Sequence, residues 1–251
     1  MRVVSCGLTD VGLKREGNED SLLCLDDLGL YAVADGMGGH AAGEVASQTA
    51  TTVVRDAVRQ ALASAPGEDA GGAGERQVQI LERSVLDANE AICRLSQENQ
   101  RYGGMGTTFS ALLVRGGKAA VAHVGDSRIY LLRNGTVRAV TNDHSWVNEQ
   151  LQRNVITVEE ARTHRWRNVI TRALGNRLDL DVDTEILDLQ PGDVFLLCSD
   201  GLTGLVPDTM LAQALREMGE RPEDTAHDLV EEAKEAGGDD NITLVILRIV
   251  E

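Results

Sequence analysis

The sequence predicts an α+β fold in which antiparallel sheets lie between pairs of helices. Two observations lead to this prediction. Strand and helix patterns are segregated along the chain, and several strand candidates follow one another through links too short for a parallel crossover. A chain of 251 residues can bury a substantial core as one domain, and no internal repeat divides it. We therefore expect a single domain over residues 1–251.

The first third of the chain predicts two strands followed by two long helices. Apolar runs bounded by turns indicate strands at 22–26 and 29–34. The stretch 41–64, rich in alanine and valine, predicts a helix, and apolar residues at near-helical spacing predict a second one over 76–101. The glycine-rich segment 65–75 between them predicts a flexible loop, so we expect an antiparallel helix pair lying on a sheet.

Four strand candidates then follow in close order, at 107–114, 118–124, 128–133 and 136–140. Their links, RGGK, GDS and RNGT, are short and contain glycine or asparagine, which favours hairpins and predicts an antiparallel meander. The polar, arginine-rich segment 144–178 interrupts this pattern and predicts helix in pieces. The remaining candidates are strands at 183–188, 193–198 and 242–250 and helices at 207–218 and 222–236.

Composition limits the classes of function. Hydrophobic residues make up 42% and charged residues 25%, as in soluble globular proteins. No run approaches the roughly 20 apolar residues of a membrane span, and the first residues lack the apolar core of a signal peptide, so we predict a cytoplasmic protein without a membrane segment. A net charge of −16 argues against a nucleic-acid partner. Because no exposed apolar stripe stands out, we expect a monomer.

The four cysteines exclude one kind of phosphatase. A cysteine phosphatase needs an arginine six residues after its nucleophile, so that one loop can wrap the phosphate. The residues at that spacing here are Gly12, Leu30, Asn99 and Gly204. We interpret the cysteines as small buried hydrophobic residues.

The segment YAVADGMGGHAAGE (31–44) joins a strand to a helix through glycines that let the backbone approach a ligand closely. Asp35 stands at the strand end, where the sheet fixes its position. An alternative interpretation is a dinucleotide fingerprint formed by Gly36, Gly38 and Ala41. That fingerprint also requires a second strand with an acidic tip, whereas the following region predicts a helix and a glycine-rich loop.

Aspartate recurs at the ends of apolar strands. Asp35, Asp126 and Asp200 follow the runs AVADG, AHVGDS and LLCSDG, and an acidic pair precedes the last strand. A single aspartate in this place is typical of a turn or a helix cap. Repeated aspartates at strand ends predict oxygen ligands for Mg²⁺ or Mn²⁺, provided that the strand ends meet in space.

Five blocks of sequence, in this order, resemble the PPM family of metal-dependent serine/threonine protein phosphatases (type 2C), particularly its bacterial members. They are TDVGLKREGNEDS (9–21), YAVADGMGGHAAGE (31–44), HVGDSRIYL (123–131), LLCSDGLTGLV (196–206) and GGDDNIT (237–243). GGMGTTFSALL (103–113) matches a further segment, which places Thr107 and Thr108 near the core of the site. The resemblance implies a four-layer αββα sandwich of two antiparallel sheets flanked by helix pairs, with a flap insertion at about 145–175.

The resemblance also implies a metal-ligand set for two Mn²⁺ or Mg²⁺ ions. Asp35 would bridge the two ions, Gly36 would offer its backbone carbonyl to one of them, and Asp200 and Asp240 would bind the other. Asp239 occupies a variable family position and is left out of the set.

Three further positions carry roles from the same resemblance. Asp126 would hold a third, weaker metal ion, and Asp20 would orient metal-bound waters, with Glu19 as a weaker candidate. Arg15 would grip the substrate phosphate, for which a planar guanidinium is suited. The implied reaction is in-line attack on phosphoserine or phosphothreonine by a water bridging the metals, without a phosphoenzyme, in opposition to a cognate serine/threonine kinase.

The general acid is left open by the sequence. Met37 stands where eukaryotic members of the family carry a histidine, and methionine has no proton to donate. His40 is our candidate catalytic donor, with His144 and a metal-bound water as alternatives.

Two other functional interpretations use the same residues. One is a non-catalytic family member that binds phosphoproteins, but such a protein would be expected to have lost an aspartate or Arg15. The other is a hydrolase of small phosphorylated molecules, which the residues do not exclude. In the flap, Arg162, Arg165, Arg167 and Arg172 form either an ordinary solvated face or a basic patch that guides phosphorylated peptides.

Overall fold

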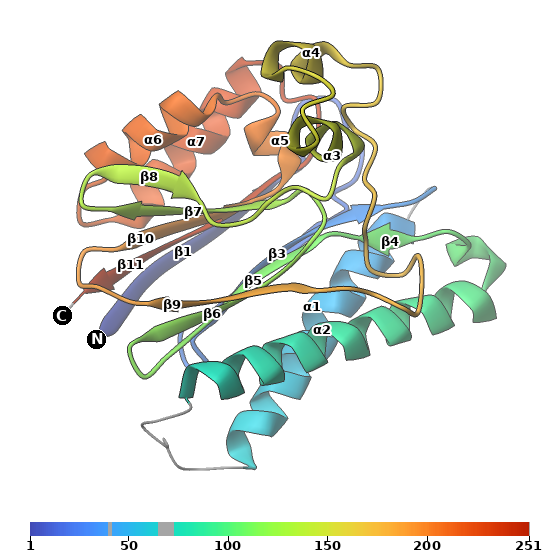
Figure 1. Ribbon diagram of the computed structural model, residues 1–251, viewed down its shortest axis with the longest axis horizontal. Coiled ribbons are helices and arrows are strands. Elements are labelled where there is room, and N and C mark those ends of the chain that lie inside the picture. The colour runs from blue at the N-terminus through green and yellow to red at the C-terminus, as the bar shows by residue number, and fades with distance from the viewer. Residues whose placement is uncertain (40–41, 65–72, 251) are drawn as a thin grey trace.

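The computed structural model describes residues 1–39, 42–64 and 73–250, with two antiparallel sheets at its centre (Figure 1). The first sheet has the strand order β1 (Arg2–Asp10), β11 (Ile242–Val250), β10 (Val194–Cys198), β7 (Arg128–Arg133) and β8 (Thr136–Ala139). The second has the order β2 (Asp20–Leu25), β3 (Leu30–Met37), β5 (Phe109–Arg115), β6 (Lys118–Val124) and β9 (Asp183–Asp188), with the short β4 (Gly106–Thr107) beside β3.

Helices cover the outer faces of both sheets. α1 (Ala42–Ala63) and α2 (Ala73–Glu98) lie against the second sheet, and α6 (Asp208–Glu217) and α7 (Pro222–Glu235) lie against the first (Figure 1). The short α5 (Asp200–Thr203) follows β10, and one 3₁₀ turn (Gln100–Tyr102) follows α2. The predicted α+β sandwich of four layers is therefore confirmed.

Three apolar cores hold these layers together. One fills the space between α1, α2 and the second sheet, and another fills the space between α6, α7 and the first sheet. The third lies between the sheets and includes Tyr31, Phe195 and Val245. Because both sheets are covered on both faces, their central strands are continuous apolar runs. β10 is buried at each of its positions, and β11 is buried at most of them.

The predicted meander is wrong in one respect. β5 pairs with β6 and β7 pairs with β8, but β6 pairs with β9 in one sheet while β7 pairs with β10 in the other. The chain therefore crosses between the sheets at Gly125–Ser127, although the link is as short as a hairpin turn. Both β6 and β7 are apolar on both faces, so each needs a central position in a sheet. The length of the link does not show whether the two strands pair as a hairpin or lie in different sheets.

The strand β1 was not predicted from the sequence. Most of its positions are half-buried, so the segment shows neither an apolar run nor a clear alternation. It pairs antiparallel with β11 along its whole length, from Arg2 opposite Val250 to Asp10 opposite Ile242. A loop was predicted at 65–75. Its residues 65–72 lie outside the described residues, and α2 already begins at Ala73.

The segment 145–175, called the flap below, contains α3 (Trp146–Gln152) and α4 (Val158–Thr163), as predicted for a region of helix in pieces. A capping box formed by Thr157 and Glu160 begins α4. Trp146 stacks on His164 with ring centroids 4.6 Å apart, and Trp166 meets Trp146 edge-on at 4.7 Å. Both tryptophans of the chain therefore stabilise the flap.

Within residues 1–39, 42–64 and 73–250, no helix combines the length and the apolar character that crossing a membrane requires.

Candidate active site

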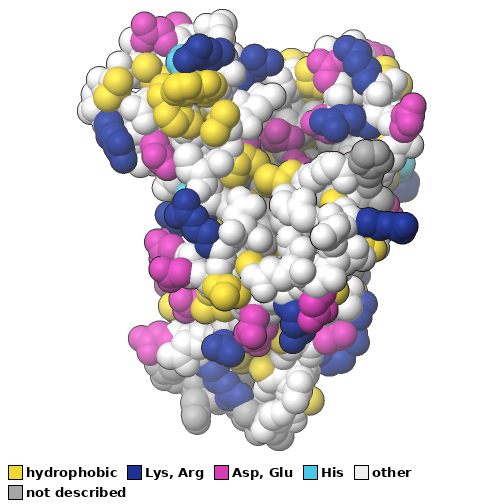
Figure 2. Space-filling model, turned by 90° about the vertical axis from the view of Figure 1, so that its right-hand side faces the viewer, with side chains coloured by type: hydrophobic (Ala, Val, Ile, Leu, Met, Phe, Trp, Pro, Cys, Tyr) yellow, Lys and Arg dark blue, Asp and Glu magenta, His cyan; other side chains and the backbone are white. Residues whose placement is uncertain are grey.

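The acidic strand ends predicted from the sequence meet at one end of the sandwich. Asp20 and Asp35 are directly opposite each other on β2 and β3. Asp200 follows β10 in the other sheet, and Asp240 lies just before β11, which is the neighbour of β10. Asp126 stands in the crossover between the sheets. In Figure 2, acidic side chains lie in the hollow between the two upper lobes.

Asp35 is fixed by the two threonines that the sequence placed near the site. Its backbone N–H donates to Thr108 Oγ1 at 2.9 Å. Its carbonyl accepts from Thr107 Oγ1 and from the Thr108 N–H, both at 2.9 Å. Thr108 Oγ1 is also 2.7 Å from Ser127 Oγ. This network ties Asp35 to the crossover that carries Asp126, so the two carboxylates keep a fixed relation.

Gly36 is required by the close approach of three backbone segments. A Cβ at this position would lie 2.2 Å from the Gly43 carbonyl oxygen and 2.4 Å from the Glu19 carbonyl oxygen. The Gly36 N–H donates to the Glu19 carbonyl at 3.1 Å. The glycine therefore lets α1 and the end of β2 pack directly against Asp35.

Asp126 is buried immediately after a residue with an unusual backbone. Gly125 has a φ of 111°, and a Cβ there would lie 2.6 Å from the Thr108 Cβ. Asp126 is 9% exposed, and its Oδ1 has no hydrogen-bond partner among the described residues. An unpaired buried carboxylate oxygen is costly unless a cation or a proton satisfies it.

Burial and mutual repulsion raise the pKa values of the clustered carboxyls. Burial raises the pKa of Asp20 to about 7 and that of Asp126 to about 8, and the charge on Asp200 contributes to both shifts. Burial, followed by the charges of Asp20, Asp200 and Asp126, raises the pKa of Asp35 well above its usual range. Burial also raises the pKa of Asp200, although a hydrogen bond shared with Asp35 works against it. In their ionised form these carboxylates are therefore destabilised, and a bound cation would stabilise them.

Arg15 lies at the rim of this cluster, held there by two adjacent loops. The Leu13 N–H donates to the Gly238 carbonyl at 2.8 Å, which joins the loop after β1 to the loop before β11. Asn241 strengthens the junction because its Nδ2 donates to the Val11 and Gly17 carbonyls, each at 3.0 Å. Arg15 NH2 then donates to Asp240 Oδ2 at 2.7 Å.

Asp239 and Asp240 differ in their surroundings. Asp239 is exposed and forms an ion pair with Lys14. The charge of Asp240, in contrast, raises the pKa values of Asp20 and Asp200. Asp240 is therefore the member of the pair that belongs to the cluster.

The donor set fits divalent cations that prefer oxygen ligands. Its members are carboxylates and a backbone carbonyl, and the orphaned Asp126 Oδ1 is a buried acceptor. Among the described residues, no three His, Cys, Asp or Glu side chains are arranged around a common metal position. A cation here would therefore rely on the Gly36 carbonyl and on water for part of its shell, as Mg²⁺ commonly does.

The candidate general acids differ in their surroundings. His40 lies outside the described residues. His144 is buried behind the Asp126 turn, where its Nδ1 accepts from the Gly125 N–H at 3.0 Å and its backbone N–H donates to the Gly125 carbonyl at 2.7 Å. These contacts make His144 a support for the turn that carries Asp126, and they do not favour a role in proton donation.

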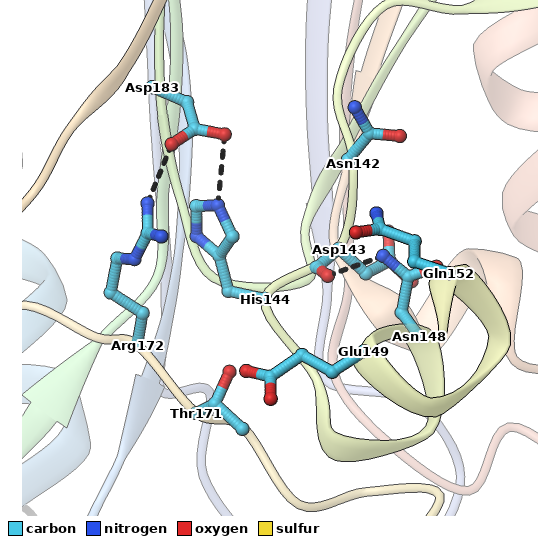
Figure 3. Close-up of a pocket in the computed structure, with 9 residues that line it drawn as sticks. All are labelled: Asn142, Asp143, His144, Asn148, Glu149, Gln152, Thr171, Arg172 and Asp183. Carbon is cyan, nitrogen blue, oxygen red and sulfur yellow. Dashed lines mark hydrogen bonds and ion pairs between the residues drawn. The ribbon is translucent and has the colours of Figure 1, made fainter. Parts of the chain in front are cut away.

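A polar cavity of about 280 Å³ lies beside His144, at the base of the flap (Figure 3). His144 Nε2 is 3.2 Å from Asp183 Oδ2 without the alignment of a hydrogen bond, and Arg172 NH1 donates to Asp183 Oδ1 at 2.6 Å. Arg172 is thus part of an ion pair at the flap base, and the other three predicted flap arginines form no ion pair among the described residues.

Several residues that position the site were not predicted from the sequence. Ser199 Oγ donates to Asp20 Oδ2 at 2.9 Å, and Asn241 Oδ1 accepts from the Glu19 N–H at 2.8 Å. Asn18 Oδ1 accepts from the Asp20 N–H at 3.0 Å. Ser199 and Asn241 are next to the predicted ligands Asp200 and Asp240 in the sequence, and Asn18 is two residues before Asp20. This short separation is the one signal that could have found them.

Comparisons with known proteins found relatives that match nearly the whole chain. The family model described as protein phosphatase 2C matches residues 15–233. The serine/threonine phosphatase stp of Listeria monocytogenes is 37% identical over 242 residues, which cover 95% of this chain and 93% of that protein. The phosphatase PstP of Mycobacterium tuberculosis is 39% identical over 245 residues, 97% of this chain and 44% of PstP. A crystal structure of the PstP catalytic domain with two manganese ions has a TM-score of 0.86 at 36% identity and matches 99% of both chains.

Proposed function

Because the chain belongs to the type 2C family of serine/threonine protein phosphatases, we propose that it hydrolyses phosphoserine and phosphothreonine in proteins by direct attack of water on phosphorus, with divalent cations held at the carboxylate cluster. The observation that carries the proposal is the convergence of Asp20, Asp35, Asp126 and Asp200, whose pKa values are all raised by burial and by the charges of neighbouring carboxylates. The related catalytic domain with two manganese ions makes Mn²⁺ or Mg²⁺ the expected cofactor, with a third, weaker ion near Asp126. When bound, these ions would activate water and neutralise charge on the phosphoryl oxygens.

The chain's own residues have separate tasks in this proposal. Asp35, the Gly36 carbonyl, Asp200 and Asp240 would hold the central pair of ions. Asp126, with Asp200, would hold the third. Asp20, oriented by Ser199, would position water through hydrogen bonds.

Arg15 would bind the substrate phosphate and stabilise the charge that develops in the transition state. His40 is our candidate for protonating the leaving oxygen, because it follows Gly36 closely in the sequence and Met37 carries no proton.

The proposed partners are phosphorylated proteins and the serine/threonine kinase that phosphorylates them. Hydrolysis of a phosphoserine or phosphothreonine ester is useful to a cell only where a kinase makes that ester. We propose that the protein acts as a monomer on these substrates.

The first test is the metal dependence of peptide dephosphorylation. We expect the purified protein to release phosphate from a phosphothreonine peptide with Mn²⁺ or Mg²⁺, to lose this activity in excess chelator, and to regain it when the metal is restored. Phosphate release at the full rate in excess chelator would contradict the proposal. A higher kcat/KM for free phosphothreonine than for the peptide would indicate a small-molecule hydrolase instead.

The flap gives a second prediction, which concerns substrate affinity. Arg165 lies over the Trp166 ring at 4.5 Å from its centroid, and the flap also exposes Val155, Val158 and Val169. Figure 2 shows hydrophobic side chains clustered on its upper left lobe, with Lys or Arg side chains and a histidine beside them, bordering the acidic hollow. Such a face would attract acidic phosphopeptides to a protein of net charge −16.

We therefore expect replacement of Arg165 and Arg167 by alanine to raise KM for an acidic phosphopeptide by about three- to tenfold at low salt, with little change in kcat. The difference should shrink at high ionic strength. The matched control replaces Arg59 and Arg94, two exposed arginines on α1 and α2, by alanine and removes the same charge. An equal rise in KM for both double variants would show that total charge, and not the flap surface, is responsible.

A further inference from the structure

The contact between Arg15 and Asp240 joins two residues that the proposed function assigns to different partners. Arg15 NH2 donates to Asp240 Oδ2 at 2.7 Å, and the Asn241 N–H donates to Asp240 Oδ1 at 2.8 Å. Both oxygens of a proposed metal ligand are thus engaged by donors of the protein itself. The phosphate-binding guanidinium is at the same time paired with a carboxylate.

A divalent cation and the Arg15 guanidinium would repel each other at the same carboxylate. Two positive groups bound to one oxygen lie only a few ångströms apart, where Coulomb repulsion is strong in a partly enclosed site. The Arg15 side chain is 49% exposed and has space to move, whereas the backbone on both sides is fastened by Asn241 and by the Leu13–Gly238 hydrogen bond. The side chain, not the loop, is therefore the part free to leave.

We propose that Arg15 is a latch on Asp240, which holds this carboxylate until a cation displaces it and thereby releases Arg15 for phosphate. The proposal rests on the proposed function, because it assumes that Asp240 binds metal and that Arg15 binds phosphate. Because Asp240 occupies NH2 of Arg15, the guanidinium has to turn away from this carboxylate before both of its terminal nitrogens can bind a phosphoryl group. Metal binding therefore precedes productive phosphate binding and makes Arg15 available for it.

A second ion pair of the chain can serve as a control for this latch. It is formed by the residues that precede Arg15 and Asp240 in the sequence. Lys14 forms an ion pair with Asp239, and both side chains are more than half exposed. This neighbouring pair has the same charges and joins the same two loops, but its side chains are more exposed than those of Arg15 and Asp240. It separates the effect of the latch from that of removing a charge near the metal site.

The first experiment measures Mn²⁺ affinity directly, by calorimetry or by the electron paramagnetic resonance signal of free Mn²⁺. We expect R15A to bind Mn²⁺ about three- to tenfold more tightly than the parent, because the cation no longer competes with the guanidinium. We expect K14A to change this affinity less than about twofold. Equal changes in R15A and K14A, or no change in R15A, would overturn the latch.

The second experiment follows inorganic phosphate binding to metal-free protein by phosphorus NMR. Replacing Asp240 by asparagine should free Arg15, so that D240N binds phosphate measurably more tightly than the parent. D239N, which loses the same charge and frees Lys14 instead, should bind phosphate much less tightly than D240N. Similar phosphate affinities for D240N and D239N would overturn the proposal.

These titrations are separate from the test of the proposed function. If the protein fails to hydrolyse phosphopeptides with any divalent cation, the proposed function falls, but the Mn²⁺ affinities of R15A and K14A still decide the latch. If R15A binds Mn²⁺ as the parent does and yet shows a raised KM for phosphopeptide, the latch falls and the phosphate-binding role of Arg15 stands.

Discussion

Replacement of Asp35 by asparagine is expected to lower kcat for phosphopeptide hydrolysis at least about a thousandfold, while the protein stays folded. Asparagine has nearly the same shape, so the backbone hydrogen bonds to Thr107 and Thr108 can persist. It lacks the negative charge with which Asp35 would help to hold divalent cations at the cluster. The measurement is the initial rate with saturating Mn²⁺, together with circular dichroism as a check on folding.

The metal-free form of the same variant should be at least as stable as the parent. The carboxyl of Asp35 is surrounded by the charges of Asp20, Asp200 and Asp126, so its neutralisation removes repulsion from the cluster. We therefore expect D35N to have an equal or higher Tm without metal and a much smaller rise in Tm on addition of Mn²⁺. D239N, which neutralises an exposed carboxylate near the site, is the control and should retain parental activity. A D35N protein as active as the parent would remove Asp35 from the metal site.

The layers of the fold could be predicted because each depends on local patterns. Apolar runs such as β10 and helical periodicity in α2 are present in short stretches of sequence, and the structure confirms them. Strand pairing could not be predicted to the same extent. The GDS link between β6 and β7 has the length and residues of a hairpin, but it crosses between sheets. Which sheet a doubly buried strand joins is decided by the whole core, not by its neighbours in the chain.

The candidate site shows the same limit. The sequence shows that Asp35, Asp126 and Asp200 stand at strand ends. It does not show that they converge, because that depends on where β3, β10 and the crossover lie in space. The resemblance selected Asp240 over Asp239 as a metal ligand, and in the structure the charge of Asp240 raises the pKa values of Asp20 and Asp200. The ion pair between Arg15 and Asp240 has no signal in the sequence, because its partners are 225 positions apart.

The metal-free protein is expected to lose stability as the pH rises from about 6.5 to about 8. A carboxyl whose pKa is higher in the folded state than in the unfolded state binds more protons when folded, so the free energy of unfolding falls as the pH rises. The pKa of Asp20 is raised to about 7 and that of Asp126 to about 8, and both lie in or near this interval. Each extra proton held by the folded state contributes a loss of about 1.4 kcal/mol per pH unit, so one such proton gives about 2 kcal/mol over the interval.

The interval is chosen so that buried histidines do not hide the effect. Burial lowers the pKa of His123 to about 4, and burial also lowers that of His144. A lowered histidine pKa makes the unfolded state bind more protons, so stability rises with pH, but only up to the unfolded value near 6.5. Above that pH the carboxyls dominate. Urea unfolding of metal-free protein at several pH values measures the slope, and D126N should show a shallower one because it removes a titrating group.

Saturating Mn²⁺ should abolish this dependence. A cation at the cluster binds the ionised carboxylates, so metal binding releases the protons that the folded protein otherwise holds. Binding then strengthens as the pH rises through the same interval, and the gain in stability from a fixed Mn²⁺ concentration grows with it. A metal-free protein whose stability does not change between pH 6.5 and 8 would mean that the cluster is already satisfied by protein donors. In that case repulsion among buried carboxylates such as Asp20 and Asp126 could not explain why the cluster binds cations.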